Sequence, residues 1–116
     1  NEGSEYRVMT NSPVYSRQLA IKGYWEEIGG ATFLPGTHRA ADRFNRLVYN
    51  LNAVPKVVDR DRALATVLSI IRHISVPLGI VDPHKPNQAS TIWRTVADHS
   101  ALTYYYEPVS SPYAFW

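Results

Sequence analysis

The hydrophobic pattern changes from helical to extended near residue 90, and this change constrains the fold more than any other feature of the sequence. Apolar residues within residues 44–51 recur at the i, i+3, i+4, i+7 spacing of one helical face. Residues 91–96 and 102–106 are instead rich in β-branched and aromatic side chains, which favour strands. The order of a strand, then helices, then antiparallel strands predicts an α+β fold with helices packed on an antiparallel sheet.

The first part of the chain is predicted to form a strand over residues 6–10 and a helix over residues 13–25. Ser12 suits the N-cap of that helix, and the following proline suits its first position, where a missing N–H costs nothing. In this register Leu19 and Ile21 face the core. Two adjacent glycines then end the helix and open a loop over residues 29–36.

Two further helices are expected before the extended region. Thr37 caps the second and Pro55 ends it, while Asp59 caps the third and Pro77 with Gly79 stops it. The apolar face of the third helix comprises Ala63, Val67, Ile70, Ile71 and Ile74, and Leu64 and Leu68 widen it.

A β-hairpin is predicted at the end of the chain, with Asp98-His99-Ser100 as its turn. Because side chains alternate along a strand, Tyr105 must point away from Tyr104 and Tyr106. An aromatic hairpin of this kind either covers a core or offers a ligand-stacking surface, and covering a core is the commoner role.

Composition excludes several classes of protein. The chain has no cysteine, so it holds no disulfide, no thiolate zinc site and no cysteine nucleophile of its own. The net charge of +2 comes from scattered arginines, which argues against nucleic acid, and no apolar run approaches the ~20 residues that span a bilayer. The four histidines lack metal-ligand spacing, and no Gly-x-Ser-x-Gly elbow is present. No metal or cofactor is therefore expected.

Five segments, taken in order, resemble the later part of the choloylglycine hydrolase family, which includes penicillin V acylases and belongs to the N-terminal-nucleophile hydrolases. They cover nearly the whole chain. The segments are Met9-Thr10-Asn11-Ser12-Pro13, Gly29-Gly30 with Leu34-Pro35-Gly36, Arg43-Phe44, Ser75-Val76-Pro77 with Gly79, and the closing hairpin with Thr91, Trp93, Thr95 and Tyr104-Tyr105-Tyr106.

The resemblance implies an αββα sandwich, of which residues 1–116 form a single partial domain at the C-terminal end. It also implies hydrolysis of a linear amide, in a conjugated bile salt, penicillin V or an acyl-homoserine lactone. The family's nucleophile is an N-terminal cysteine that uses its own α-amino group as base. That residue would lie in another portion or chain of the same enzyme, which is the expected partner.

Asn11 matches the family's asparagine that donates to the oxyanion, and Arg43 matches its arginine beside the nucleophile. Without the resemblance, Asn11 is an ordinary turn residue, and Arg43 is a partly buried arginine paired with an acid or reaching solvent. Phe33 and Leu34 either line an acyl pocket or pack within their loop.

Two departures from the family pattern stand out. Thr37 replaces the aspartate that many relatives carry, and both residues cap helices. The stretch before residue 29 is shorter than in relatives that form tetramers, so a homo-oligomer is possible without that contact. In this short stretch the chain resembles the family members of Gram-negative bacteria, and that resemblance favours a periplasmic over a cytoplasmic location.

Two rival hypotheses remain. One is a self-contained, non-catalytic α+β binding module, and the other is a family member that has lost catalysis.

Overall fold

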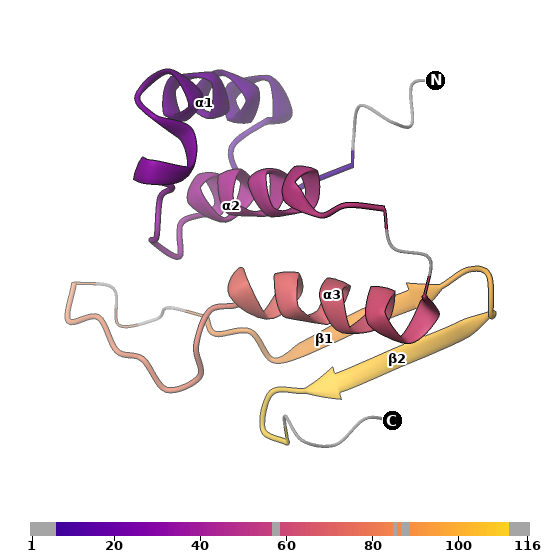
Figure 1. Ribbon diagram of the computed structural model, residues 1–116. Helices are drawn as coiled ribbons and strands as arrows, with labels where there is room; N and C mark the ends of the chain where they lie inside the picture. The colour runs from indigo at the N-terminus through magenta and orange to yellow at the C-terminus, as the bar shows by residue number, and fades with distance from the viewer. Residues whose placement is uncertain (1–6, 57–58, 85, 87–88, 112–116) are drawn as a thin grey trace. The chain divides into compact units, whose positions relative to one another are not determined.

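The computed structural model describes residues 7–56, 59–84, 86 and 89–111. The chain divides into two compact units, Asn1–Val57 and Val58–Trp116. Each unit has its own elements and is described separately (Figure 1). The prediction that residues 1–116 form one partial domain therefore stays a prediction.

The first unit contains helix α1 (Tyr15–Glu27), the short 3₁₀ helix η2 (Gly30–Phe33) and helix α2 (Ala40–Ala53). Both η2 and α2 pack against α1 (Figure 1). The exit from α1 passes through Gly29 and Gly30, whose φ angles of 134° and 55° are open to glycine at little cost.

Helix α1 begins two residues later than predicted, and Ser12 does not cap it. The N-cap position is Val14, which makes no side-chain cap hydrogen bond. The buried side chain of Gln18 donates to the carbonyl oxygen of Pro13 at 2.7 Å. The carbonyl oxygen of Val14 accepts the backbone N–H groups of Arg17 and Gln18, and these are the first hydrogen bonds of the helix.

The buried face of α1 also differs from the prediction. Leu19 is 45% exposed and Ile21 is half-buried, whereas Gln18 is only 2% exposed. Tyr15, one turn before Gln18, packs edge-on against the buried ring of Phe44, with 6.0 Å between the ring centroids. The face centred on these two residues meets α2, which leaves Leu19 about 100° around the helix.

Helix α2 ends before Pro55 as predicted, and Phe44 is the most buried residue of its apolar stripe. Its N-cap position is Arg39 rather than Thr37, and no side chain caps it. The Thr37 hydroxyl instead accepts from the Arg39 N–H at 3.2 Å and donates to the Asp42 carboxylate. Thr37 thus stabilises the approach to the helix from two residues outside the cap.

The second unit begins with helix α3 (Arg60–His73), and Asp59 caps it as predicted. The Asp59 carboxylate accepts the N–H of Arg62 at 2.8 Å. Leu68 and Ile70 are the buried residues of this helix, while Val67 on the predicted face is partly exposed.

Strands β1 (Trp93–Asp98) and β2 (Thr103–Pro108) form the predicted antiparallel hairpin, with Trp93 opposite Pro108. The Asp98 carboxylate holds the turn by accepting the N–H groups of Ser100 and Ala101, each at 3.0 Å. Helix α3 packs against β1 (Figure 1). Tyr105 is half-buried between the exposed Tyr104 and Tyr106, which confirms the predicted alternation.

The predicted strand over residues 6–10 is not formed by the residues that the structure describes. Tyr6 lies outside them, and residues 7–10 are irregular although Val8 is buried. A strand requires a hydrogen-bonded neighbour, and the sheet seen in the described ranges contains β1 and β2 alone.

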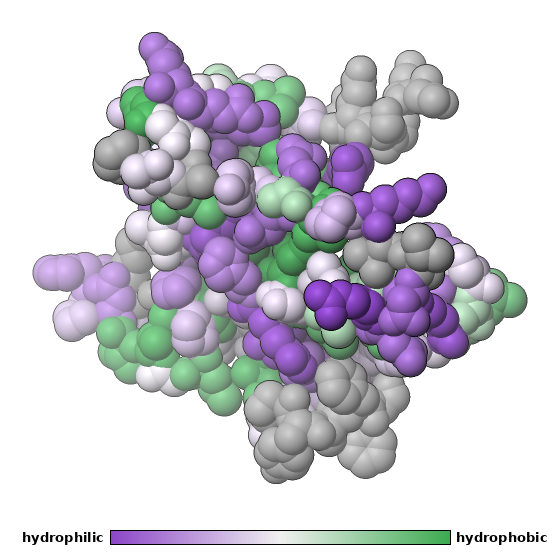
Figure 2. Space-filling model, in the orientation of Figure 1, coloured by the Kyte–Doolittle hydropathy of each residue, from purple (hydrophilic) through white to green (hydrophobic). Residues whose placement is uncertain are grey.

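Hydrophobic side chains reach the surface in the second unit. Figure 2 shows them over the segment that follows α3 and at the turn of the hairpin. The exposed members include Leu78, Ile80, Val81, Ile92 and Leu102. Across the described ranges, none of the helices has the length and apolar character that a membrane crossing requires.

Candidate functional site

The structure brings together the two residues predicted to act in catalysis. Arg43 of α2 donates from Nη2 to the side-chain oxygen of Asn11 at 2.8 Å, across 32 positions of sequence. Its Nε donates to the backbone carbonyl of His38 at 3.0 Å. The guanidinium is therefore held at two points and presents one edge to Asn11.

This contact fixes the orientation of the Asn11 amide. A guanidinium has only donors, so the Asn11 atom facing it must be the carbonyl oxygen. The amide nitrogen then points away from Arg43, and within the described ranges no protein atom accepts from it. Asn11 thus offers an N–H donor beside a fixed positive charge.

Arg46, one turn after Arg43, holds the loop that leads into α2. It is buried, and its Nη1 donates to the carbonyl oxygens of Pro35 at 2.9 Å and Thr37 at 2.7 Å. Burial lowers the pKa of its guanidinium, and the nearby carboxylate of Asp42 opposes that change. Sequence reasoning missed Arg46, although an arginine three residues after Arg43 on a helix shares its side.

Gln18 is a second buried polar residue that sequence reasoning missed. Its Nε2 lies 2.9 Å from the hydroxyl of Thr10, 3.4 Å from the carbonyl of Thr10 and 2.7 Å from the carbonyl of Pro13. Gln18 and residues 9–15 line a cavity of about 400 Å³ that includes Asn11. The signal for this role was a polar residue among the apolar positions of α1.

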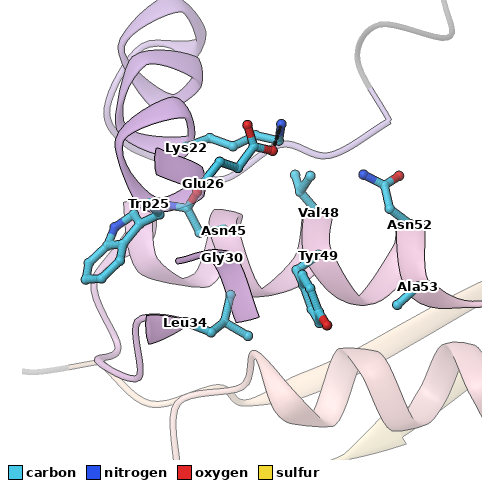
Figure 3. Close-up of a pocket in the computed structure, with 10 residues that line it drawn as sticks. All are labelled: Lys22, Trp25, Glu26, Gly30, Leu34, Asn45, Val48, Tyr49, Asn52 and Ala53. Atoms are coloured by element: carbon cyan, nitrogen blue, oxygen red, sulfur yellow. Dashed lines mark hydrogen bonds and ion pairs between the residues drawn. The ribbon is translucent and has the colours of Figure 1, made fainter. Parts of the chain in front are cut away.

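Leu34, predicted to line an acyl pocket, lies in a different cavity. That cavity, of about 410 Å³, is formed by residues of α1 and α2 together with Gly30 and Leu34 (Figure 3). Trp25, Tyr49 and the Lys22–Glu26 ion pair also line it, whereas Asn11 and Arg43 do not. The side chain of Phe33 lies outside the described residues.

No set of three or more potential metal ligands (His, Cys, Asp or Glu) gathers within the part of the chain that the structure describes. Asn11 and Arg43 themselves offer hydrogen-bond donation and positive charge, and neither side chain is a nucleophile.

Comparison with known proteins identifies the family. The model of the family described as linear amide C-N hydrolases, choloylglycine hydrolase family, matches residues 2–113. The chain belongs to that family.

Two relatives of this choloylglycine hydrolase family chain are penicillin V acylases. One, from Pectobacterium atrosepticum, is 48% identical over 128 aligned residues, which cover 100% of this chain and 34% of that protein. The other is the solved structure of penicillin V acylase from Agrobacterium tumefaciens, with 51% identity and a TM-score of 0.80. That match covers 90% of this chain and 33% of the solved chain.

These matches confirm the predicted fold class and family. The three helices and two antiparallel strands belong to the N-terminal-nucleophile hydrolase fold of the matched acylase structure. The chain spans about a third of the length of either relative.

A buried ion cluster joins α3 to the hairpin in the second unit. Glu107, 1% exposed, accepts at Oε1 from Arg72 at 2.9 Å and from Arg94 at 3.3 Å. Arg94 also donates from Nε to the hydroxyl of Ser75 at 2.8 Å, and that hydroxyl donates to the carbonyl of Ile71. The cluster ties the end of α3 to both strands.

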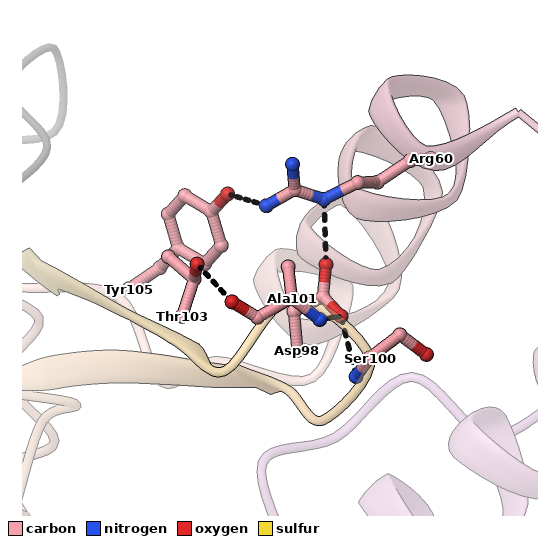
Figure 4. Close-up of polar contacts among 6 residues, drawn as sticks. All are labelled: Arg60, Asp98, Ser100, Ala101, Thr103 and Tyr105. Atoms are coloured by element: carbon pink, nitrogen blue, oxygen red, sulfur yellow. Dashed lines mark hydrogen bonds and ion pairs between the residues drawn. The ribbon is translucent and has the colours of Figure 1, made fainter.

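A second, exposed ion pair joins the other end of α3 to the turn (Figure 4). Arg60 donates to the Asp98 carboxylate at 2.8 Å and to the Tyr105 hydroxyl at 3.2 Å. The hydrogen bond from Arg60, aided by the N–H of Ala101, lowers the pKa of Asp98. Together the two clusters hold the hairpin on α3 at both ends.

Proposed function

We propose that this chain supplies an oxyanion donor and a site arginine to a linear amide hydrolase whose cysteine nucleophile lies outside the chain. The observation that carries the proposal is the 2.8 Å hydrogen bond from Arg43 to Asn11. It joins the two residues that match the family's functional positions, and it leaves an amide N–H to donate.

In the proposed reaction, a thiolate attacks the carbonyl carbon of the substrate amide, and negative charge develops on the carbonyl oxygen. Asn11 donates its amide N–H to that oxygen. The C–N bond then breaks, the amine leaves with a proton, and water hydrolyses the thioester. An oxyanion donor of this kind typically contributes about a hundredfold or more to the rate.

Arg43 has two effects in this scheme. Its positive charge favours the thiolate over the thiol of a nearby cysteine. Its hydrogen bond to the Asn11 oxygen also withdraws electron density from the amide, which makes the N–H a better donor. Both effects depend on the anchor at the His38 carbonyl, because that contact limits how far the guanidinium can move.

We propose amides of the penicillin V class as substrates, because both relatives described above are penicillin V acylases. Conjugated bile salts and acyl-homoserine lactones are the comparison substrates. The short stretch before residue 29 supports a periplasmic enzyme.

The proposed partner is the remainder of the enzyme, and the hairpin carries a surface suited to it. Trp93, Tyr104 and Tyr106 are exposed on the sheet face opposite α3, and we call them the aromatic face. An exposed aromatic sheet face typically packs on another layer, as in a sandwich with two sheets. The matched acylases have about two-thirds of their length outside the match, which is enough to supply that layer.

The test replaces the matching third of the Agrobacterium tumefaciens acylase with this chain. We call the product the completed enzyme. Hydrolysis is followed by the release of a primary amine from penicillin V, with a glycine-conjugated bile salt and an acyl-homoserine lactone in parallel. We expect penicillin V hydrolysis that depends on the N-terminal cysteine.

The control carries serine at the cysteine position, and it should fold but lose most of the activity. A folded completed enzyme that hydrolyses none of the three substrates would contradict the proposal. That result would favour a chain that has lost its catalytic role or acts as a binding module.

A further inference from the structure

The side chain of Gln18 spans the turn that carries Asn11. Its Nε2 donates to the hydroxyl of Thr10 at 2.9 Å on one side and to the carbonyl of Pro13 at 2.7 Å on the other. The carbonyl of Thr10 lies within reach of the same nitrogen at 3.4 Å. One amide group thus joins the residue before Asn11 to the second residue after it.

The two carbonyl oxygens among these partners show which end of the Gln18 amide faces the turn. A carbonyl oxygen can only accept, so the NH₂ end of Gln18 must face the carbonyls of Thr10 and Pro13. The turn is held by this nitrogen from α1 and by the contact that Arg43 of α2 makes with the Asn11 side chain. Gln18 restrains the backbone of the turn, and Arg43 restrains the amide plane.

The burial of Gln18 is costly and needs a reason. It is 2% exposed, and its Oε1 is buried with no hydrogen bond within the described part of the chain. An unsatisfied buried polar atom costs about 1–3 kcal/mol. A methionine or leucine would fill the same space without that cost, so packing alone does not explain a glutamine here.

We propose that Gln18 is a positioning residue, which holds the turn so that the Asn11 N–H meets the developing oxyanion. This inference rests on the proposed function of Asn11. Gln18 touches neither substrate nor nucleophile in this scheme and acts through Asn11. A displacement of about 1 Å at a reacting group can cost up to about a hundredfold in rate.

The test is a double-mutant cycle in the completed enzyme, built from Gln18→Met and Asn11→Ala. Methionine is close in size to glutamine but cannot donate. We expect Gln18→Met to lower kcat by about tenfold to a hundredfold with KM little changed. In the Asn11→Ala background the same substitution should have almost no effect, because the group that it positions is gone.

Two further variants keep the test decisive. Thr10→Val removes the hydroxyl acceptor at nearly constant volume, so it should lower kcat in the same direction by a smaller factor even if Gln18→Met folds poorly. Ser16→Ala, exposed on the same helix, is the matched control and should leave kcat unchanged.

The outcomes are distinguishable. If Asn11→Ala lowers kcat while Gln18→Met and Thr10→Val do not, the role of Gln18 is overturned and the role of Asn11 stands. A loss on Gln18→Met that is equal in both backgrounds shows a purely structural role and also overturns the inference. If Asn11→Ala itself leaves kcat unchanged, the proposed oxyanion donor fails, and the role of Gln18 fails with it.

Discussion

Replacing Glu107 with glutamine should destabilise the fold more than any single change at an exposed ion pair. Glu107 is 1% exposed and accepts from two arginines, of which Arg94 is 12% exposed at its side chain and Arg72 is 44% exposed. Glutamine keeps the shape and one acceptor oxygen but removes the negative charge. Arg94 then keeps its bond to Ser75 but loses its buried counter-ion.

The magnitude follows from burial. Removing one partner of a buried ion pair typically costs about 3–5 kcal/mol. Arg72 is partly exposed, so water can replace much of the stabilisation that its guanidinium receives from Glu107. One Glu107 oxygen is buried without a hydrogen bond in the described ranges, which reduces the stabilisation that the native cluster contributes. We therefore expect a loss near the low end, about 3 kcal/mol in the free energy of unfolding.

The assay is urea unfolding of the completed enzyme, with the free energy obtained from the midpoint and slope. Asp98→Asn is the matched control, because it neutralises the exposed pair with Arg60 at the other end of the same helix. Its effect should be much smaller. The double variant Arg94→Met with Glu107→Leu should be more stable than Glu107→Leu alone, since no buried charge is left unpaired. Equal losses for Glu107→Gln and Asp98→Asn would refute the reasoning.

Three other predictions follow from the contacts described above. Arg43→Lys should lower kcat about tenfold. A lysine ammonium keeps the positive charge but cannot bind the Asn11 side chain and the His38 carbonyl at the same time, as the guanidinium does. A kcat equal to that of the parent would count against this prediction. The pKa of Asp98 is lowered from its usual value of 3.8, so its stabilisation is present above that value and is lost as pH falls through the lowered pKa. The difference in urea midpoint between the parent and Asp98→Asn should therefore shrink below about pH 4, and a constant difference would argue against the Arg60 contact. The isolated chain should self-associate through its aromatic face, because a two-stranded sheet with one face uncovered has marginal stability. A chain that is monomeric by light scattering and unfolds in one cooperative transition would contradict this prediction.

Local signals predicted the second unit well. Asp59 is a residue type that favours the helix N-cap, and apolar residues at helical spacing follow it. Residues 91–106 combine strand-forming residues with a turn around Asp98. In both cases the decisive contacts join residues close in sequence. Such features can be read without knowledge of the rest of the fold.

The first unit shows where local reading fails. A reading based on hydrophobic periodicity assumes that polar residues are exposed, so it predicted a buried Leu19. It missed Gln18 and Arg46, which are buried and donate hydrogen bonds to backbone carbonyls. Residues 7–10 have strand-like composition, but the described residues offer them no hydrogen-bonded neighbour. Asn11 could be singled out only through the family resemblance, because its contact spans 32 positions.

The central claim is that the Asn11 amide nitrogen donates to the oxyanion, and Asn11→Asp tests it most directly. Aspartate has the same size and still accepts from Arg43, but it places a carboxylate oxygen where the donor was. We predict that kcat of the completed enzyme falls by about a hundredfold or more, while the enzyme stays folded and Ser16→Ala, at an exposed position of α1, has no effect. Near-parental kcat for Asn11→Asp would show that Asn11 serves only as a partner for Arg43, and would contradict the account.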